Sequence, residues 1–285
     1  MLEATKQKKI TLGENTTPIT YLFGVAQRIE SLGEEPIKNQ ITATIKKTFV
    51  KKDSLGYLYK IEVTDRKQSN IDDMLGLEKE LAFLQKNILL YTNSFGEIIS
   101  IVNRGQIAED WYDQAKLIKK SYRYLMSEID QFLIGINDLL NDNESFVSLI
   151  KKSEIYSLLF PPVYDQQLMK KITIEQQKNF DHFFDATSLP LKIKTAITGI
   201  NAQTKGKQIV RSGKLDMARF DKESASELFT KSYEVNEYAL NFNVSYLETF
   251  DLDEENQVDK ANGMLGAKIN DLYQLKQMSK LKKNK

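Results

Sequence analysis

Residues 41–63 have the sequence ITATIKKTFVKKDSLGYLYKIEV, in which apolar and polar side chains alternate on both sides of a turn. Because successive side chains of a β-strand point to opposite faces, this period of two indicates strands with one buried face. The apolar residues that alternate are Ile41, Ala43, Ile45 and Phe49 before the turn residues Asp53, Ser54 and Gly56, and Tyr57, Tyr59, Ile61 and Val63 after them. The stretch therefore predicts a long β-hairpin.

The segments on either side of this hairpin extend the β-rich pattern. Residues 21–29 predict an earlier strand, and residues 71–84 have the spacing of a short helix. Residues 88–91 and 98–102 predict a second hairpin, because the turn sequence NSFG separates two apolar runs.

The C-terminal part of the chain repeats the order of hairpin, short helix and hairpin. Residues 191–197 and 209–217 predict a hairpin, and residues 221–232 predict a helix. Residues 238–250 alternate most clearly of all, and residues 264–275 are expected to pair with them. An ancient duplication would explain the shared order, but antiparallel proteins without a duplication also show it.

The middle of the chain changes to a helical period. In residues 107–139, apolar side chains recur at alternating spacings of four and three, which predicts one heptad-patterned helix about 50 Å long. These side chains are Trp111, Ala115, Ile118, Tyr122, Leu125, Ile129, Phe132, Ile136 and Leu139. Such a stripe requires a covering surface, either inside the chain or on a partner.

Two further helices are expected after this segment. The first spans residues 145–160 and ends at Pro161 and Pro162. The second spans residues 173–186 and starts at a possible capping box, Thr173 to Gln176.

These elements predict an α+β fold, with long antiparallel hairpins at both ends of the chain forming one or two curved sheets around a central helical block. The expected segments are a flexible N-terminal segment at 1–17, a β-rich half at 18–103, the helical block at 104–188, a second β-rich half at 189–275 and a Lys-rich tail at 276–285, which is expected to fray.

Composition excludes several classes of function. Forty basic and thirty-nine acidic residues leave a formal charge of +1, so nucleic acid is not expected as the main partner. The chain has no cysteine, which excludes disulfides and thiolate chemistry. No transmembrane run or signal-like segment is evident, so we expect a cytoplasmic protein, and the Lys, Asn and Ile usage suggests a bacterial source.

Candidate sites for metals or catalysis are weak. The single histidine, His182, could share a metal or a proton with Asp185 on a helix, but it lacks further ligands and stands beside phenylalanines typical of a core. Asp251, Asp253 and Glu255 alternate as in a calcium loop, yet the residues at its glycine and final glutamate positions do not match. We therefore expect no metal, no cofactor and no catalytic residue.

Two lysine clusters are noted. One consists of Lys46, Lys47, Lys51 and Lys52, and the other of Lys276, Lys280, Lys282, Lys283 and Lys285. Solvated surface and a disordered tail explain both clusters, while an acidic partner, a membrane surface or RNA are the alternatives.

The hypothesis that follows is a non-enzymatic protein-interaction component, such as an adaptor, chaperone or assembly subunit, that binds another protein or itself. The predicted partner-binding residues are Trp111, Ile118, Tyr122, Leu125, Ile129 and Phe132. The alternative is a carrier that holds a lipid or another apolar ligand between a curved sheet and the helices. An enzyme would have to rely on groups such as Asp181, His182 and Asp185.

Overall fold

The computed structural model describes residues 10–70, 73–164, 174–184, 187–200, 206–235 and 240–284. The protein is mostly antiparallel sheet, so the α+β class overstates the share of its helices. Its strands are β1 (Ile19–Ser31), β2 (Ile37–Asp53), β3 (Gly56–Gln68), β4 (Asn87–Thr92), β5 (Ile98–Ile101), β6 (Ile174–Phe184), β7 (Thr187–Ile200), β8 (Lys207–Leu215), β9 (Phe242–Leu252), β10 (Val258–Ile269) and β11 (Tyr273–Lys283). Its helices are α1 (Asp73–Leu81), the 3-10 helix η1 (Ala82–Gln85), α2 (Arg104–Tyr122), α3 (Ile129–Asn141), α4 (Asn143–Lys152), α5 (Glu154–Leu159) and α6 (Lys222–Tyr233).

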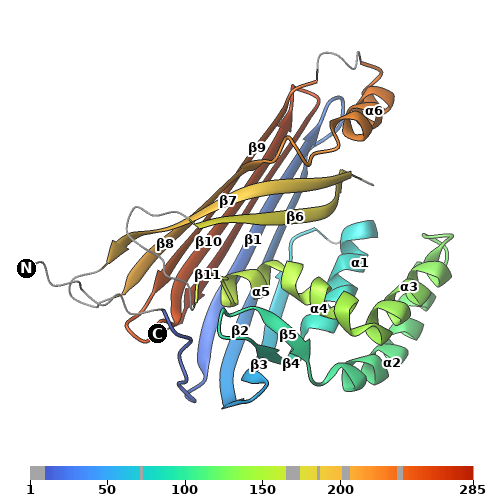
Figure 1. Ribbon diagram of the computed structural model, residues 1–285. Helices are drawn as coiled ribbons and strands as arrows, with labels where there is room; N and C mark the ends of the chain where they lie inside the picture. The colour runs from blue at the N-terminus through green and yellow to red at the C-terminus, as the bar shows by residue number, and fades with distance from the viewer. Residues whose placement is uncertain are drawn as a thin grey trace, which may run out of the picture. The chain divides into compact units, whose positions relative to one another are not determined.

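The eleven strands form one sheet in the order β5-β4-β3-β2-β1-β11-β10-β9-β8-β7-β6 (Figure 1). The first and last strands of the chain are thus neighbours in the sheet, while β5 and β6 stand at the two ends of the order. Pairing is antiparallel from β2 to β5 and from β6 to β11. The predicted hairpins at residues 41–63, 88–102 and 191–217 are therefore confirmed.

The chain packs as two compact units. Unit 1 comprises Met1–Ile10, Gly24–Gln40 and Gln166–Lys282, and unit 2 comprises Thr11–Phe23, Ile41–Asp165 and Lys283–Lys285. Strands β1 and β2 each contribute residues to both units, so neither unit is a continuous piece of the chain.

The hairpin of β2 and β3 turns where the sequence predicts it. Asp53 pairs with Gly56, and Gly56 has a backbone φ of +129°, which side-chain-bearing residues rarely adopt. A Cβ at Gly56 would also lie 2.2 Å from the Thr92 carbonyl oxygen on β4. This position therefore requires glycine both for its conformation and for the close approach of the next strand.

The long helix predicted over residues 107–139 is wrong. Helix α2 ends at Tyr122, the chain turns, and α3 begins at Ile129, so the two halves of the stripe pack on each other as a helical hairpin. The Trp111 indole nitrogen donates to Asn137 Oδ1 at 2.9 Å, and Lys119 pairs with Asp130 at 2.7 Å. Folding back covers much of the stripe within the chain, which a single straight helix cannot do.

The helix predicted over residues 173–186 is also wrong, because its described residues form strand β6. Gln176 pairs with Ile193 and Phe180 with Leu189 on β7. Residues such as Glu175, Gln176 and Lys178 are adequate helix formers, but the hydrogen bonds with a neighbouring strand outweigh that local preference. The predicted helical block at 104–188 therefore ends earlier, at α5.

Residues 276–283 of the Lys-rich segment expected to fray belong to β11, and Lys285 lies outside the described residues. Leu275 is 7% exposed and Leu281 is completely buried, and both alternate with exposed lysines. In the expected flexible N-terminal segment, Ile10 and Leu12 are likewise buried. None of the helices in the described ranges is long and apolar enough to cross a membrane.

Candidate functional site

The predicted partner-binding residues of the α2–α3 hairpin differ widely in exposure. Trp111, Ile118 and Ile129 are buried, with exposures of 1%, 1% and 5%. Tyr122 and Phe132 are half-buried, and Leu125 is 66% exposed. An incoming protein could therefore reach Leu125 directly, but it could not reach the three buried side chains without opening the hairpin.

Besides Leu125, the hairpin exposes four large apolar side chains that the heptad stripe did not include. The exposed set is Tyr112, Leu117, Tyr124, Leu125 and Ile134, with exposures between 57% and 83%. Tyr112 and Leu117 lie on α2, Tyr124 and Leu125 lie in the turn that follows it, and Ile134 lies on α3. We call these five residues the hairpin surface.

Cations border the two tyrosine rings of this surface. The Lys116 ammonium lies 3.9 Å from the centre of the Tyr112 ring, and the Arg123 guanidinium lies 4.5 Å from the centre of the Tyr124 ring. Cation–π contacts at exposed sites contribute about 0.5–1 kcal/mol each. A cation therefore lies over each tyrosine ring, and Lys116 is also paired with Asp113 at 3.0 Å.

A second candidate site is a buried group of charges in unit 1, which we call the Arg211 cluster. Arg211 on β8 forms an ion pair with Glu248 on β9, and both side chains are less than 7% exposed. Lys178 on β6 lies 3.3 Å from the same carboxylate and also donates to the Tyr246 hydroxyl. The remaining guanidinium nitrogens of Arg211 donate to Thr195 and Gln176, so each of its three nitrogens makes a hydrogen bond.

The two cations control the ionisation of Glu248. Burial by itself raises the pKa of this carboxyl group, but the charges of Lys178 and Arg211, together with hydrogen bonds to Tyr246 and Lys178, lower it further than burial raises it. The net effect is a pKa below the ordinary range, so Glu248 is ionised near neutral pH. The cluster then contains one anion, Glu248, and two cations, Lys178 and Arg211. The Lys178 side chain is 27% exposed.

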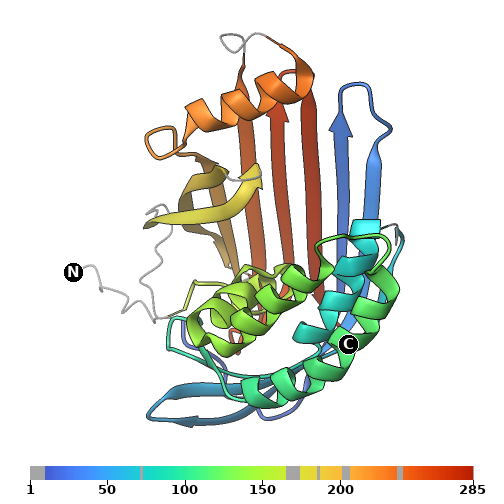
Figure 2. The ribbon, with the colours of Figure 1, turned by 90° about the vertical axis from the view of Figure 1, so that its right-hand side faces the viewer.

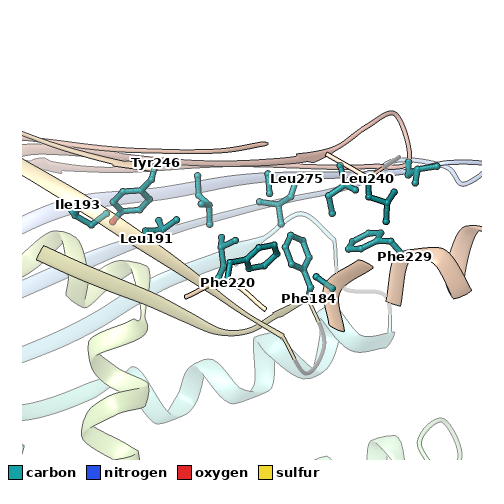
Figure 3. Close-up of a cluster of buried hydrophobic side chains, with 14 residues drawn as sticks. Phe184, Leu191, Ile193, Phe220, Phe229, Leu240, Tyr246 and Leu275 are labelled. Carbon is teal, nitrogen blue, oxygen red and sulfur yellow. The ribbon is translucent and has the colours of Figure 1, made fainter. Parts of the chain in front are cut away.

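The Arg211 cluster adjoins an aromatic core. Figure 3 shows Tyr246 and Leu275 from the strands facing Phe184 and Phe229 from the other side of the core. Phe229 belongs to α6, the orange helix that lies across the ends of the red strands in Figure 2. The buried core is bordered by partly exposed apolar residues, namely Ile29, Phe180, Phe183, Leu215, Leu228, Tyr233, Val235, Phe242, Val244 and Tyr273.

Lys47 was expected on a solvated surface, but it is only 3% exposed. Its ammonium donates to the Leu159 carbonyl at 3.3 Å and lies over the rings of Tyr59 and Phe160. Leu159 is the last residue of α5, so a cation at this end complements the helix dipole. Lys47 thus fixes α5 against strand β2.

The weak metal candidates gain no support. His182 lies on strand β6, so it does not have the helical spacing to Asp185 on which the hypothesis depended, and Asp185 lies outside the described residues. Asp253 accepts hydrogen bonds from the backbone of Glu255 and Gln257 and so organises the β9–β10 turn. Within the described part of the chain, no group of three acids or histidines could hold a metal ion.

Sequence reasoning missed the Arg211 cluster, although a signal was present. In residues 238–250, the inward positions are even-numbered, and Glu248 occupies one of them between Tyr246 and Phe250. A carboxylate in the apolar phase of a strand requires a buried cation. That cation could not be identified, because Lys178 and Arg211 are 70 and 37 residues away.

Comparison with known proteins does not assign a family. No protein-family model matches the chain, and no curated protein matches it. One similar solved structure, titled for lipid–protein interactions in lipovitellin, is 9% identical over 94% of this chain and 25% of that chain, with a TM-score of 0.46. Another is DynF from the dynemicin biosynthesis pathway of Micromonospora chersina, which is 5% identical over 98% of this chain and 86% of that chain, with a TM-score of 0.20.

This chain thus spans a quarter of the lipovitellin chain that it matches. Neither TM-score establishes a shared fold. The function is therefore inferred from the geometry of the chain itself.

Proposed function

We propose that this protein is an interaction component that binds another protein through the hairpin surface of α2 and α3. The observation that carries the proposal is the exposure of Tyr112, Leu117, Tyr124, Leu125 and Ile134 on a single helical hairpin. Burying a large apolar side chain contributes about 1.5–3 kcal/mol, so covering this surface would drive association.

The packing of the hairpin supports this proposal and also revises which residues meet the partner. Trp111, Ile118 and Ile129 hold the two helices together, so their role is to support the surface. The residues that contact the partner are those of the hairpin surface, together with the half-buried Tyr122 and Phe132. Tyrosine is enriched where binding energy concentrates in protein interfaces.

The test is the mass of the protein and its complexes by light scattering, measured on the purified protein and on the material isolated with it from its source cells. We expect a stoichiometric complex, with either a second copy or another protein, that the triple variant Leu117→Ser, Tyr124→Ser, Leu125→Ser loses. The matched control is Leu55→Ser with Ile200→Ser, because these residues are similarly exposed, at 64% and 59%, in the β2–β3 turn and at the end of β7. The proposal would be contradicted if the triple variant still formed the complex. It would also be contradicted if the triple variant and the control variant lost the complex to the same extent.

A second function, carriage of an apolar ligand, is favoured by the partly exposed aromatic border of the core in unit 1. Phe180, Phe183, Phe242 and Tyr273 are half-buried there, and the Lys178 ammonium lies 5.1 Å from the centre of the Phe180 ring. Extraction of the purified protein followed by mass spectrometry tests this function. A co-purifying lipid that Phe183→Ser reduces would support it, and an extract without lipid would remove it.

A further inference from the structure

Strand β11 separates its side chains by type. Its inward positions carry Leu275, Ser279 and Leu281, which are buried. Its outward positions carry Lys276, Met278, Lys280 and Lys282, and all four are exposed. Lys276, Lys280 and Lys282, which were expected in a disordered tail, therefore lie on one side of a regular strand.

The register of the neighbouring strands extends this outward face. Met278 pairs with Met264 on β10, and Met264 pairs with Leu247 on β9. The three side chains are 63%, 41% and 36% exposed, so they form a continuous apolar row across β9, β10 and β11. Apart from Gly266, the outward positions on both sides of this row carry polar residues, namely Ser245 and Lys276 on one side and Thr249, Asn262 and Lys280 on the other.

The charge on this face is strongly positive. Its outward positions in register hold five lysines, Lys260, Lys268, Lys276, Lys280 and Lys282, and one acid, Asp251. Lys260 stands directly opposite Lys282, a pairing of like charges that costs stability in the sheet. Lys268 forms an ion pair with Asp271 at 2.9 Å, whereas no ion pair among the described residues involves Lys260, Lys276, Lys280 or Lys282.

We propose that the outward face of β9–β11 docks on the surface of an anionic lipid bilayer. The lysines would contact the lipid headgroups, and Met264, Met278 and Leu247 would enter the boundary between headgroups and acyl chains. Unneutralised lysines around an exposed apolar row complement such a surface in both charge and polarity.

The residue types favour a bilayer over the other acidic partners. Lysine is depleted in protein–protein interfaces, because ordering its long side chain is costly. Nucleic-acid sites add to their phosphate-binding lysines arginines that read bases or aromatic rings that stack on them, and the outward register positions of these three strands carry neither. A fluid bilayer accepts flexible Lys and Met side chains without requiring one fixed geometry.

The experiment is cosedimentation of the full chain with phosphatidylcholine vesicles, with and without phosphatidylserine. We expect binding only to the anionic vesicles, with an affinity that falls as salt is raised. Lys276→Gln with Lys280→Gln should weaken binding about 30-fold, which is about fivefold for each lysine. The matched control, Lys120→Gln with Lys151→Gln, removes the same charge from the exposed surface of α2 and α4 and should change binding less than twofold.

Two further variants separate charge from insertion. Lys276→Arg with Lys280→Arg should keep the affinity, while Met264→Ser with Met278→Ser should weaken binding to anionic vesicles even at low salt. Equal binding to neutral vesicles, or equal loss in the control, would overturn the proposal. Binding of the protein to polyglutamate or duplex DNA but not to vesicles would overturn it as well. These variants leave the hairpin surface intact, so the result is independent of the proposed protein-binding function.

Discussion

The side chain of Glu248 links three strands, β6, β8 and β9. Its carboxylate meets Arg211 from β8 and Lys178 from β6 while its own backbone lies in β9. Lysine on an edge strand that points inward is also a known device against edge-to-edge aggregation, and β6 stands at the end of the sheet order. The cluster thus has a structural role whether or not it binds a ligand.

Replacement of the carboxylate tests this role. We expect Glu248→Gln to lower the free energy of unfolding by about 3–5 kcal/mol, because it leaves two cations in a buried site without an anion. Urea denaturation followed by circular dichroism measures the change. The double variant Glu248→Leu with Arg211→Met removes both members of the buried pair and should recover part of the loss. A single variant within about 0.5 kcal/mol of the wild type would show that the pair is dispensable.

The same residue predicts how stability depends on pH. Because the folded-state pKa of Glu248 lies below its unfolded value of about 4.3, its contribution is present above that pH and is lost as the pH falls below it. Asp53 acts in the same direction, since the Lys51 ammonium, the Tyr91 hydroxyl and the Leu55 amide lower its pKa to about 2. The free energy of unfolding should therefore fall steadily from about pH 4 towards pH 2.

Urea denaturation at a series of pH values measures this dependence. In Glu248→Gln the fall should be shallower by up to about 1.4 kcal/mol per pH unit, the effect of one fewer proton taken up on unfolding. Asp53→Asn serves as the second variant, and it should also flatten the profile. Parallel profiles for the wild type and Glu248→Gln would show that Glu248 does not titrate differently in the folded state.

At the scale of elements, the α2–α3 segment shows why a correct apolar pattern predicted the wrong element. The heptad spacing is real, but the chain satisfies it by folding back, with the Trp111 indole bonded to Asn137 across the hairpin. A straight helix and a helical hairpin present the same spacing in sequence. Only the contacts between the two halves distinguish them.

A pair of substitutions separates these two arrangements. Trp111→Ala should cost about 3–5 kcal/mol of unfolding free energy, because it empties a buried site and leaves Asn137 without its donor. Leu125→Ala should change stability by less than about 0.5 kcal/mol, because this side chain is 66% exposed. Chemical denaturation gives both values. Similar losses in the two variants would indicate a seam that buries both residues equally.

At the scale of the whole molecule, the sheet joins segments that are far apart in the chain. Strand β11 has β1 as a neighbour, and the Asn284 amide donates to the Thr20 carbonyl at 2.8 Å. Unit 1 likewise needs Gly24–Gln40 in addition to its C-terminal part. The N-terminal and C-terminal strands therefore depend on each other for pairing within the one sheet.

Fragments test this dependence. We expect residues 166–285 alone to aggregate, because removal of β1 leaves the edge of β11 unpaired. Coexpression with residues 1–165 should restore a soluble complex with the circular dichroism spectrum of the intact chain. A monomeric, cooperatively folded 166–285 fragment, detected by light scattering and thermal unfolding, would show that the early strands are not required.

The sequence by itself determined most strands and their buried faces, because a period of two is a local property that each segment carries alone. It did not determine whether residues 174–184 form a helix or a strand, where the heptad segment bends, or that Lys276, Lys280 and Lys282 line one face of a sheet. Those outcomes depend on partners far away in the chain, such as β7 for β6 and Arg211 for Glu248. Tertiary structure decided them, because hydrogen bonds between strands and the burial of charge outweigh local preference.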